Sequence, residues 1–152
     1  MADGKAQNTK SLFRTACEVT ANIQATSEKI WSILTMAEDI PRWNSTIISL
    51  EGDIRLGETI YLKSTVAPER TFNLKVTTLQ TPSKMVWEDG MALMFKGVRT
   101  YTLMPQRNGT TDFHMIEVIS GLMLPIIGGS LPDFRPTFEQ FAADLKQIAE
   151  NS

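Results

Sequence analysis

The chain opens with a polar stretch and then alternates apolar and polar residues with a period of two. Residues 1–11 are small and mostly polar, so we expect them to form a loose, disordered tail. Alternation over residues 17–24 predicts a half-buried strand. Thr26 or Ser27 can cap the helix that follows, and a second short helical turn is expected at residues 38–43.

From residue 44 to residue 121 the pattern changes to short alternating segments separated by turn residues. The predicted strands cover residues 47–50, 59–65, 70–80, 84–88, 95–104 and 110–120. The last two are joined by a hairpin turn at residues 105–109, which ends in Asn108-Gly109. Strands connected by tight turns predict one antiparallel meander.

The strongest helical pattern lies near the C-terminus. Its apolar residues recur at steps of three and four: Phe134, Phe138, Phe141, Leu145 and Ile148. Asp133 is the expected N-cap, and Pro136 suits the first turn. A sheet with one apolar face needs a cover, and only this helix is long enough to lie in the concavity of a curved sheet. We therefore expect a single α+β domain over residues 12–152.

Composition limits the classes of function. The 152 residues carry a net charge of −2 and no block of like charge, which argues against nucleic acid and against an anionic membrane held by charge. The longest apolar run, residues 122–127, is far shorter than the roughly 20 residues that span a bilayer. One cysteine and one histidine predict no disulfide framework, no metal site and no cofactor. The polar N-terminus shows no secretory signal, so we expect a cytoplasmic location.

Several short motifs follow one another in a recognisable order between residues 16 and 150. They are Ile23-Gln-Ala, Trp31-Ser-Ile-Leu, Pro41-Arg-Trp43-Asn44, Leu50-Glu51-Gly52, Met85-Val-Trp87, Gly97-Val-Arg99-Thr-Tyr101-Thr-Leu103-Met-Pro105, Gly109-Thr-Thr, Glu117, Gly121 and Phe138-Glu-Gln-Phe141 with Leu145-Lys146 and Ala149-Glu150. In this order and spacing the chain resembles the START-related, polyketide-cyclase/dehydrase-like superfamily, also called SRPBCC.

The resemblance implies a helix-grip fold. In this fold a seven-stranded, curved antiparallel sheet wraps around a long C-terminal helix, and two short helices lie between the first and second strands. It also implies an apolar cavity that holds a lipid, sterol, polyketide or plant-hormone-like molecule. Members include binding proteins, carriers, receptors and a minority of enzymes, so the resemblance predicts the fold better than the activity.

Two charged residues share the apolar face of the last two strands. Pairing Leu103 with Phe113 across the hairpin places Arg99 opposite Glu117, with both side chains directed inward. Burying one charge alone is costly, so we expect an ion pair. The two side chains are either a polar anchor for a ligand carboxylate, hydroxyl or carbonyl, or a purely structural pair, or they reach solvent at the open end of the sheet. Tyr101, between the two, either offers its hydroxyl to the same ligand or is a core aromatic residue.

The remaining inward positions are apolar and form the predicted cavity wall. They are Phe72, Leu74, Val76, Met85, Trp87, Tyr101, Leu103, Phe113, Met115, Phe138 and Phe141. The alternative is that these side chains fill a solid core. His114 is expected on the solvent face, and Cys17 as a small buried hydrophobic residue. Residues 122–127 either line the cavity entrance or form a surface for a homodimer.

Three functions are consistent with these features. The first is binding of a small hydrophobic molecule, such as a lipid, a sterol or an aromatic polyketide, between the sheet and the C-terminal helix. The second is an aromatase/cyclase or dehydratase, in which Glu117 would act as the proton acceptor beside Arg99 and Tyr101. The third is a protein-interaction or co-chaperone role, which the resemblance also allows.

Overall fold

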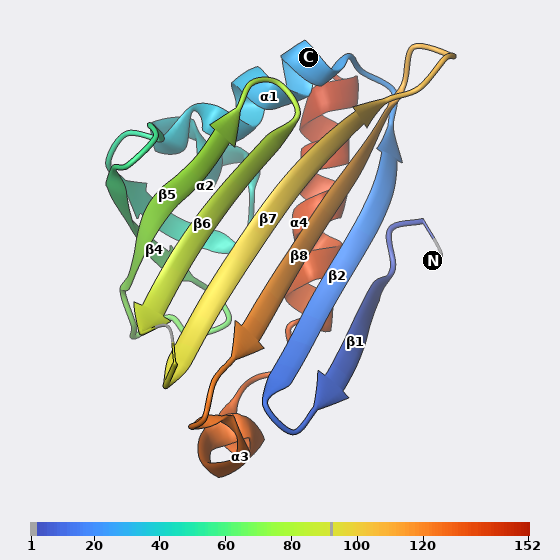
Figure 1. Cartoon of the computed structure of the whole chain (residues 1–152). Coiled ribbons are helices and arrows are strands. Elements are labelled where there is room, and N and C mark those ends of the chain that lie inside the picture. Colours follow the sequence, from blue (N-terminus) through green and yellow to red (C-terminus); the bar gives the residue numbers. More distant parts are fainter. Residues whose placement is uncertain (1–2, 92) are drawn as a thin grey trace.

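The computed structural model describes residues 3–91 and 93–152. Within them, eight antiparallel strands form one sheet in the order β1-β2-β8-β7-β6-β5-β4-β3, which curves around helix α4 (Figure 1). The strands are β1 (Ala6–Ser11), β2 (Arg14–Ile23), β3 (Ile47–Glu51), β4 (Thr59–Ser64), β5 (Phe72–Gln80), β6 (Lys84–Met91), β7 (Phe95–Pro105) and β8 (Thr111–Ser120). The helices are α1 (Ser27–Thr35), α2 (Ile40–Trp43), α3 (Leu124–Ile127) and α4 (Arg135–Glu150), with 3₁₀ turns η1 (Ala37–Asp39) and η2 (Gly128–Ser130). The predicted helix-grip fold is confirmed, with one additional strand.

The additional strand lies in the segment that we expected to be a loose tail. Residues 6–11 form β1, which pairs with β2 from Ala6 opposite Val19 to Ser11 opposite Arg14. Its end is fixed to α4, because the Ala6 N–H donates to Glu139 Oε2 at 2.9 Å. The prediction is therefore wrong for these residues. An edge strand is held by backbone hydrogen bonds, and this one carries almost no apolar side chains that would have revealed it.

Side-chain hydrogen bonds mark the starts of the two longer helices. Thr26 caps α1 as expected, with its hydroxyl accepting the Lys29 N–H at 3.2 Å. The expected N-cap of α4 is one residue too early, since the cap position is Phe134. The Asp133 carboxylate accepts the Arg135 backbone N–H at 3.0 Å and also pairs with the Arg135 guanidinium.

The core fills one half of the concavity. Phe141 of α4 lies 6.2 Å from Phe113 and 5.9 Å from Tyr101, measured between ring centroids. Helices α1 and α2 close this end of the sheet (Figure 1). The side chains of Phe113, Phe138 and Phe141 are almost completely buried, so this half of the interior is solid.

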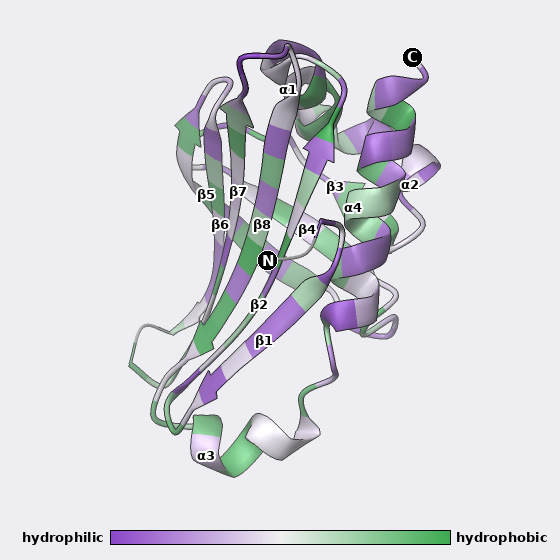
Figure 2. Ribbon diagram, turned by 90° about the vertical axis from the view of Figure 1, so that its right-hand side faces the viewer, coloured by the Kyte–Doolittle hydropathy of each residue, from purple (hydrophilic) through white to green (hydrophobic). Residues whose placement is uncertain are grey.

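Helix α4 is shorter than the strands that it covers. Its 16 residues span about 24 Å, whereas the 11 residues of β7 span about 36 Å. The strands therefore continue past the first turn of α4 toward α3 (Figure 2). At this end the concave face is covered by α3, η2 and the segment 131–134 instead of by a long helix, which leaves space beneath them.

Candidate functional site

A cavity of about 610 Å³ occupies the end of the concavity that α4 does not reach. Its walls come from β4 to β8 and from the chain between α3 and α4. The lining residues are Leu62, Ser64, Val66, Ala67, Arg70, Phe72, Leu74, Trp87, Asp89, Phe95, Gly97, Arg99, Glu117, Ile119, Met123, Ile127, Ser130, Leu131, Pro132 and Phe134. Its size and largely apolar wall, with a few polar groups, are typical of small-molecule sites.

The Arg99–Glu117 pair forms the polar part of the cavity wall. The predicted register is confirmed, because Leu103 pairs with Phe113 and Arg99 lies opposite Glu117. Arg99 Nε donates to Glu117 Oε1 at 2.9 Å, and the two side chains are only 14% and 17% exposed. The expected inward ion pair is thus present.

The surroundings shift the ionisation of Glu117. Burial raises the pKa of its carboxyl group above the ordinary value, the positive charge of Arg99 opposes this shift, and Asp89 adds to it. Glu117 is therefore easier to protonate than a surface glutamate. The Arg99 guanidinium, which remains charged at accessible pH, also lies 5.1 Å from the centre of the Phe138 ring.

Hydrogen-bonding groups without partners lie beside this pair. Arg99 pairs with Glu117 through Nε, so among the described residues its terminal nitrogens have no carboxylate partner. Trp87, opposite Arg99 on β6, has a buried indole N–H without a partner in the same part of the chain. A guanidinium carries five N–H donors, so Arg99 has several available to an oxygen atom that enters the cavity.

Tyr101 lies deeper than the cavity. Its ring packs 4.9 Å from that of Trp87, and its buried hydroxyl has no partner among the described residues. Burial raises the pKa of this hydroxyl, and the charge on Arg99 opposes the shift. Tyr101 lines a void of about 10 Å³, which is large enough for about one water molecule.

The predicted ligand-binding residues therefore divide into two groups. The structure places Phe72, Leu74, Trp87, Arg99 and Glu117 in the wall of the large cavity. It places Val76, Met85, Tyr101, Leu103, Phe113, Met115, Phe138 and Phe141 in the packed core and outside this wall, while Leu74 and Trp87 belong to both the wall and the core. The sequence left two alternatives, a cavity wall or a solid core. The first holds at one end of these strands and the second at the other end. Ligand binding by the first group remains a prediction.

Further wall residues lie outside the predicted ligand-binding set. Met123 and Ile127 belong to the segment for which the sequence left two alternatives, the cavity entrance or a dimer surface, and they line the cavity. Phe134 belongs to the predicted phenylalanine stripe but lies ahead of the regular helix. Asp89 shares parity with Trp87 on β6, and continuing the alternation by one step would have found it.

Comparisons with known proteins place the chain in a family. The family model described as "Activator of Hsp90 ATPase homolog 1-like protein" matches residues 24–149. The chain belongs to this family. A comparison with curated proteins found no match.

Solved structures share the fold at low sequence identity. A START superfamily protein from Mycobacterium smegmatis has a TM-score of 0.65 at 17% identity, over 89% of this chain and 97% of that one. CalU16 from Micromonospora echinospora has a TM-score of 0.62 at 12% identity, over 97% of this chain and 86% of its own. DynU16, from the dynemicin biosynthetic locus, has a TM-score of 0.66 at 14% identity, over 88% of this chain and 46% of that one. These likenesses show the helix-grip fold.

A second cavity of about 510 Å³ lies on the other side of the segment 131–134. It is bounded by the β1–β2 hairpin, β8 and the chain from α3 to Arg135. The two cavities share Glu117, Ile119, Leu131, Pro132 and Phe134. Glu117 is thus reached from both sides of the covering segment.

Two further residues singled out in the sequence have different surroundings. His114 is on the outer face of β8, where its Nε2 lies 2.9 Å from Glu18 Oε2. Cys17 lines the second cavity, but burial raises the pKa of its thiol to about 12, which leaves it un-ionised near neutral pH. Within residues 3–91 and 93–152, no group of three or more His, Cys, Asp or Glu side chains is arranged to hold a metal ion.

Proposed function

We propose that the protein binds a small, mostly apolar molecule that carries an oxygen acceptor. The supporting observation is the 610 Å³ cavity with Arg99 and Glu117 in its wall. The apolar body would lie against Phe72, Leu74 and Phe134, and the oxygen would accept from the terminal nitrogens of Arg99. A lipid, a sterol or an aromatic polyketide with a carbonyl, hydroxyl or carboxylate group meets this description.

A fluorescence titration with N-phenyl-1-naphthylamine tests whether the cavity accepts an apolar guest. Ala67 lines the cavity but lies outside the hydrophobic core, so Ala67→Trp fills space without disturbing packing. We expect wild type to bind the dye and Ala67→Trp to bind it about tenfold more weakly, because it displaces buried apolar contact. The matched control is Met104→Trp at a 58% exposed position. Equal binding by all three proteins, or none by wild type, would reject the proposal.

The oxygen acceptor is tested by a pair of probes of equal length. Decanoate and decane differ only in the carboxylate, so the ratio of their affinities isolates the polar contact. We expect Arg99→Met/Glu117→Gln to reduce the preference for decanoate about tenfold or more, since a charged hydrogen bond contributes roughly 1.5–3 kcal/mol. An unchanged preference would mean that the pair is purely structural.

The second candidate function, a cyclase or dehydratase, is favoured by the raised pKa of Glu117. A carboxylate with a raised pKa beside a cation is suited to removing a proton next to a carbonyl that Arg99 polarises. Tyr101 supports this function less, because its side chain lies in the packed core.

A β-hydroxy ketone probes this chemistry directly. In 4-hydroxy-4-phenyl-2-butanone, Glu117 would take the proton from C3 while the C4–O bond breaks. The departing hydroxide would then receive a proton and leave as water, giving a conjugated enone that absorbs in the ultraviolet. We expect Glu117→Gln to abolish enone formation, with Glu139→Gln on α4 as the control. Turnover that survives Glu117→Gln would exclude this role.

A further inference from the structure

Large apolar side chains are exposed at the end of the molecule where the cavity lies. They belong to the β1–β2 turn, the β6–β7 turn and the start of α3. They are Leu12, Phe13, Met91, Leu93, Met94, Leu122 and Ile126, and we call them the apolar tip. Leu93 and Ile126 are each 77% exposed, which is unusual for side chains of this size.

Backbone hydrogen bonds join the three segments into one surface. The Gly121 N–H donates to the Phe13 carbonyl at 3.1 Å, and the Leu122 N–H donates to the Leu93 carbonyl at 3.0 Å. A third bond, from the Met123 N–H to the Met94 carbonyl, measures 2.9 Å. The exposed side chains are therefore held together by β-sheet and turn geometry instead of extending independently into solvent.

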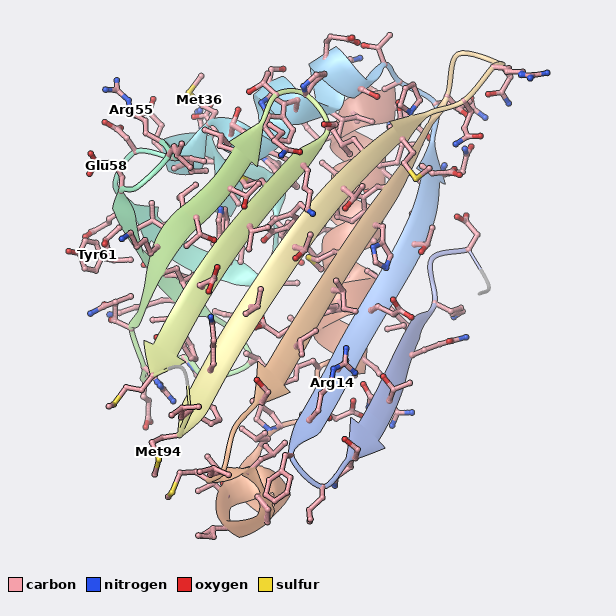
Figure 3. The ribbon with its side chains drawn as sticks, viewed as in Figure 1. Arg14, Met36, Arg55, Glu58, Tyr61 and Met94 are labelled. Carbon is pink, nitrogen blue, oxygen red and sulfur yellow. The ribbon has the colours of Figure 1, made fainter. Side chains whose placement is uncertain are left out.

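The charge around the apolar tip is one-sided. Residues 4–17, 90–111 and 118–132, which supply the tip, contain no aspartate or glutamate. Lys10 and Arg14 are exposed on the β1–β2 hairpin and have no ion-pair partner among the described residues. Figure 3 shows Arg14 and Met94 at the same end of the sheet. Of the nearby acids, Asp89 and Glu117 line the large cavity, and the exposed Asp133 is paired with Arg135.

We propose that the apolar tip docks on the surface of a phospholipid bilayer. Apolar side chains from several loops, flanked by cations and free of acids, match the boundary between headgroups and acyl chains. The net charge of −2 argues against attraction by charge alone, so the apolar side chains supply most of the binding.

The position of the tip supports a lipid surface as the occupant. Met123 and Ile127, on the segment that carries the tip, line the large cavity, and Leu124 and Pro125 line the second one. Docking through the tip would place the wall that residues 123–127 contribute to both cavities next to the bilayer. An apolar guest would then move between membrane and protein without crossing water, where its exposure is costly.

Co-sedimentation with lipid vesicles tests the docking. Full-length protein is mixed with vesicles of phosphatidylcholine, with and without phosphatidylglycerol. We expect wild type to sediment with both, and more strongly with the anionic mixture. Phe13→Ser, Leu93→Ser and Ile126→Ser should each lower partitioning by about tenfold, because each removes one large inserted side chain. The matched control is Leu56→Ser, at a 64% exposed position in the β3–β4 loop, which should leave partitioning unchanged.

A further variant separates charge from apolar insertion. Arg14→Gln should weaken binding to the phosphatidylglycerol mixture and leave binding to pure phosphatidylcholine unchanged. Wild type that stays in the supernatant with both vesicles overturns the proposal. Equal loss in Leu56→Ser and in the tip variants overturns it as well. Sedimentation velocity without vesicles shows whether a second copy of the chain occupies the tip. In that case wild type would be a dimer, the tip variants would be monomers, and the protein would not bind vesicles, which also overturns the proposal.

The vesicle test and the dye titration fail independently. Phe13, Leu93 and Ile126 do not line either large cavity. Their serine variants should therefore bind N-phenyl-1-naphthylamine in vesicle-free solution as tightly as wild type does. Dye binding without vesicle binding rejects docking alone, whereas vesicle binding without dye binding rejects only the ligand cavity.

Discussion

Gly97 leaves the space that the Glu117 carboxylate occupies: a Cβ atom at Gly97 would lie 3.2 Å from Glu117 Oε2, with no other atom within 4 Å. Gly97 is on β7, two residues before Arg99, on the same inward face. The absence of a side chain here thus allows the carboxylate to reach Arg99 Nε at 2.9 Å.

Gly97→Ala should displace Glu117 and weaken its pairing with Arg99. The new methyl group contacts only the end of a flexible side chain, so we expect a loss of about 1 kcal/mol in the free energy of unfolding. Urea denaturation measures it. Gly129→Ala is the matched control, because a Cβ there has nothing within 4 Å. Equal stability of both variants would mean that the carboxylate moves without cost.

The raised pKa of Glu117 makes stability depend on pH in a defined direction. Because the folded state holds the proton more tightly than the unfolded state, stability is fully present below the unfolded pKa of about 4.3 and falls as pH rises through the folded pKa. Glu117→Gln, which cannot ionise, should lack this component. Urea midpoints of the two proteins, measured from pH 4 upward, should therefore diverge as pH rises, with wild type losing relative stability.

Glu88 provides an internal comparison of opposite sign. Hydrogen bonds from Lys96 and Thr77 lower its pKa, so its contribution is present above the unfolded pKa and is lost as pH falls through the folded one. Glu88→Gln should therefore converge with wild type at low pH. If the stability difference between Glu117→Gln and wild type vanished at high pH instead of at low pH, the assignment of the Glu117 pKa shift to burial would be wrong.

Phe72 and Phe141 should respond differently to truncation, although both are predicted inward aromatic residues. Phe141 is 3% exposed in the packed half, so Phe141→Ala should cost about 3–5 kcal/mol. Phe72 is half-buried in the cavity wall, and Phe72→Ala should cost less than half as much while weakening dye binding. Thermal unfolding and the dye titration measure the two effects. Similar costs for both would imply that the cavity is collapsed in solution.

The contrast between Phe72 and Phe141 separates what could be predicted from the sequence from what could not. Alternation and the hairpin turn were sufficient to predict the register that places Arg99 opposite Glu117. They were insufficient to separate cavity wall from core, because Phe72 and Phe113 are both phenylalanines on the inward face of their strands. The difference depends on how far α4 extends along the strands, and that follows from where the helix begins relative to the sheet. Periodicity within one element gives no information about that relationship.

The N-terminal segment was mispredicted for a related reason. A central strand shows an apolar face because both of its neighbours and a layer of core lie against it. Strand β1 has one neighbour and covers little of the core, so its residues remain polar. Strand β1 forms because it pairs with the edge of β2, which would otherwise expose unpaired N–H and carbonyl groups.

Deleting residues 1–11 should therefore destabilise the protein instead of leaving it unchanged. The deletion removes the β1–β2 ladder and the hydrogen bond from Ala6 to Glu139, and it uncovers Cys17 and Ala16 on β2. We expect a loss of several kcal/mol in urea denaturation, since each of several backbone hydrogen bonds contributes roughly 0.5–1.5 kcal/mol. Amide hydrogen exchange gives a second readout, because β2 amides that donate to β1 should lose protection while those of β7 and β8 keep it. A truncated protein as stable as wild type, with β2 still protected, would show that β1 does not hold the edge.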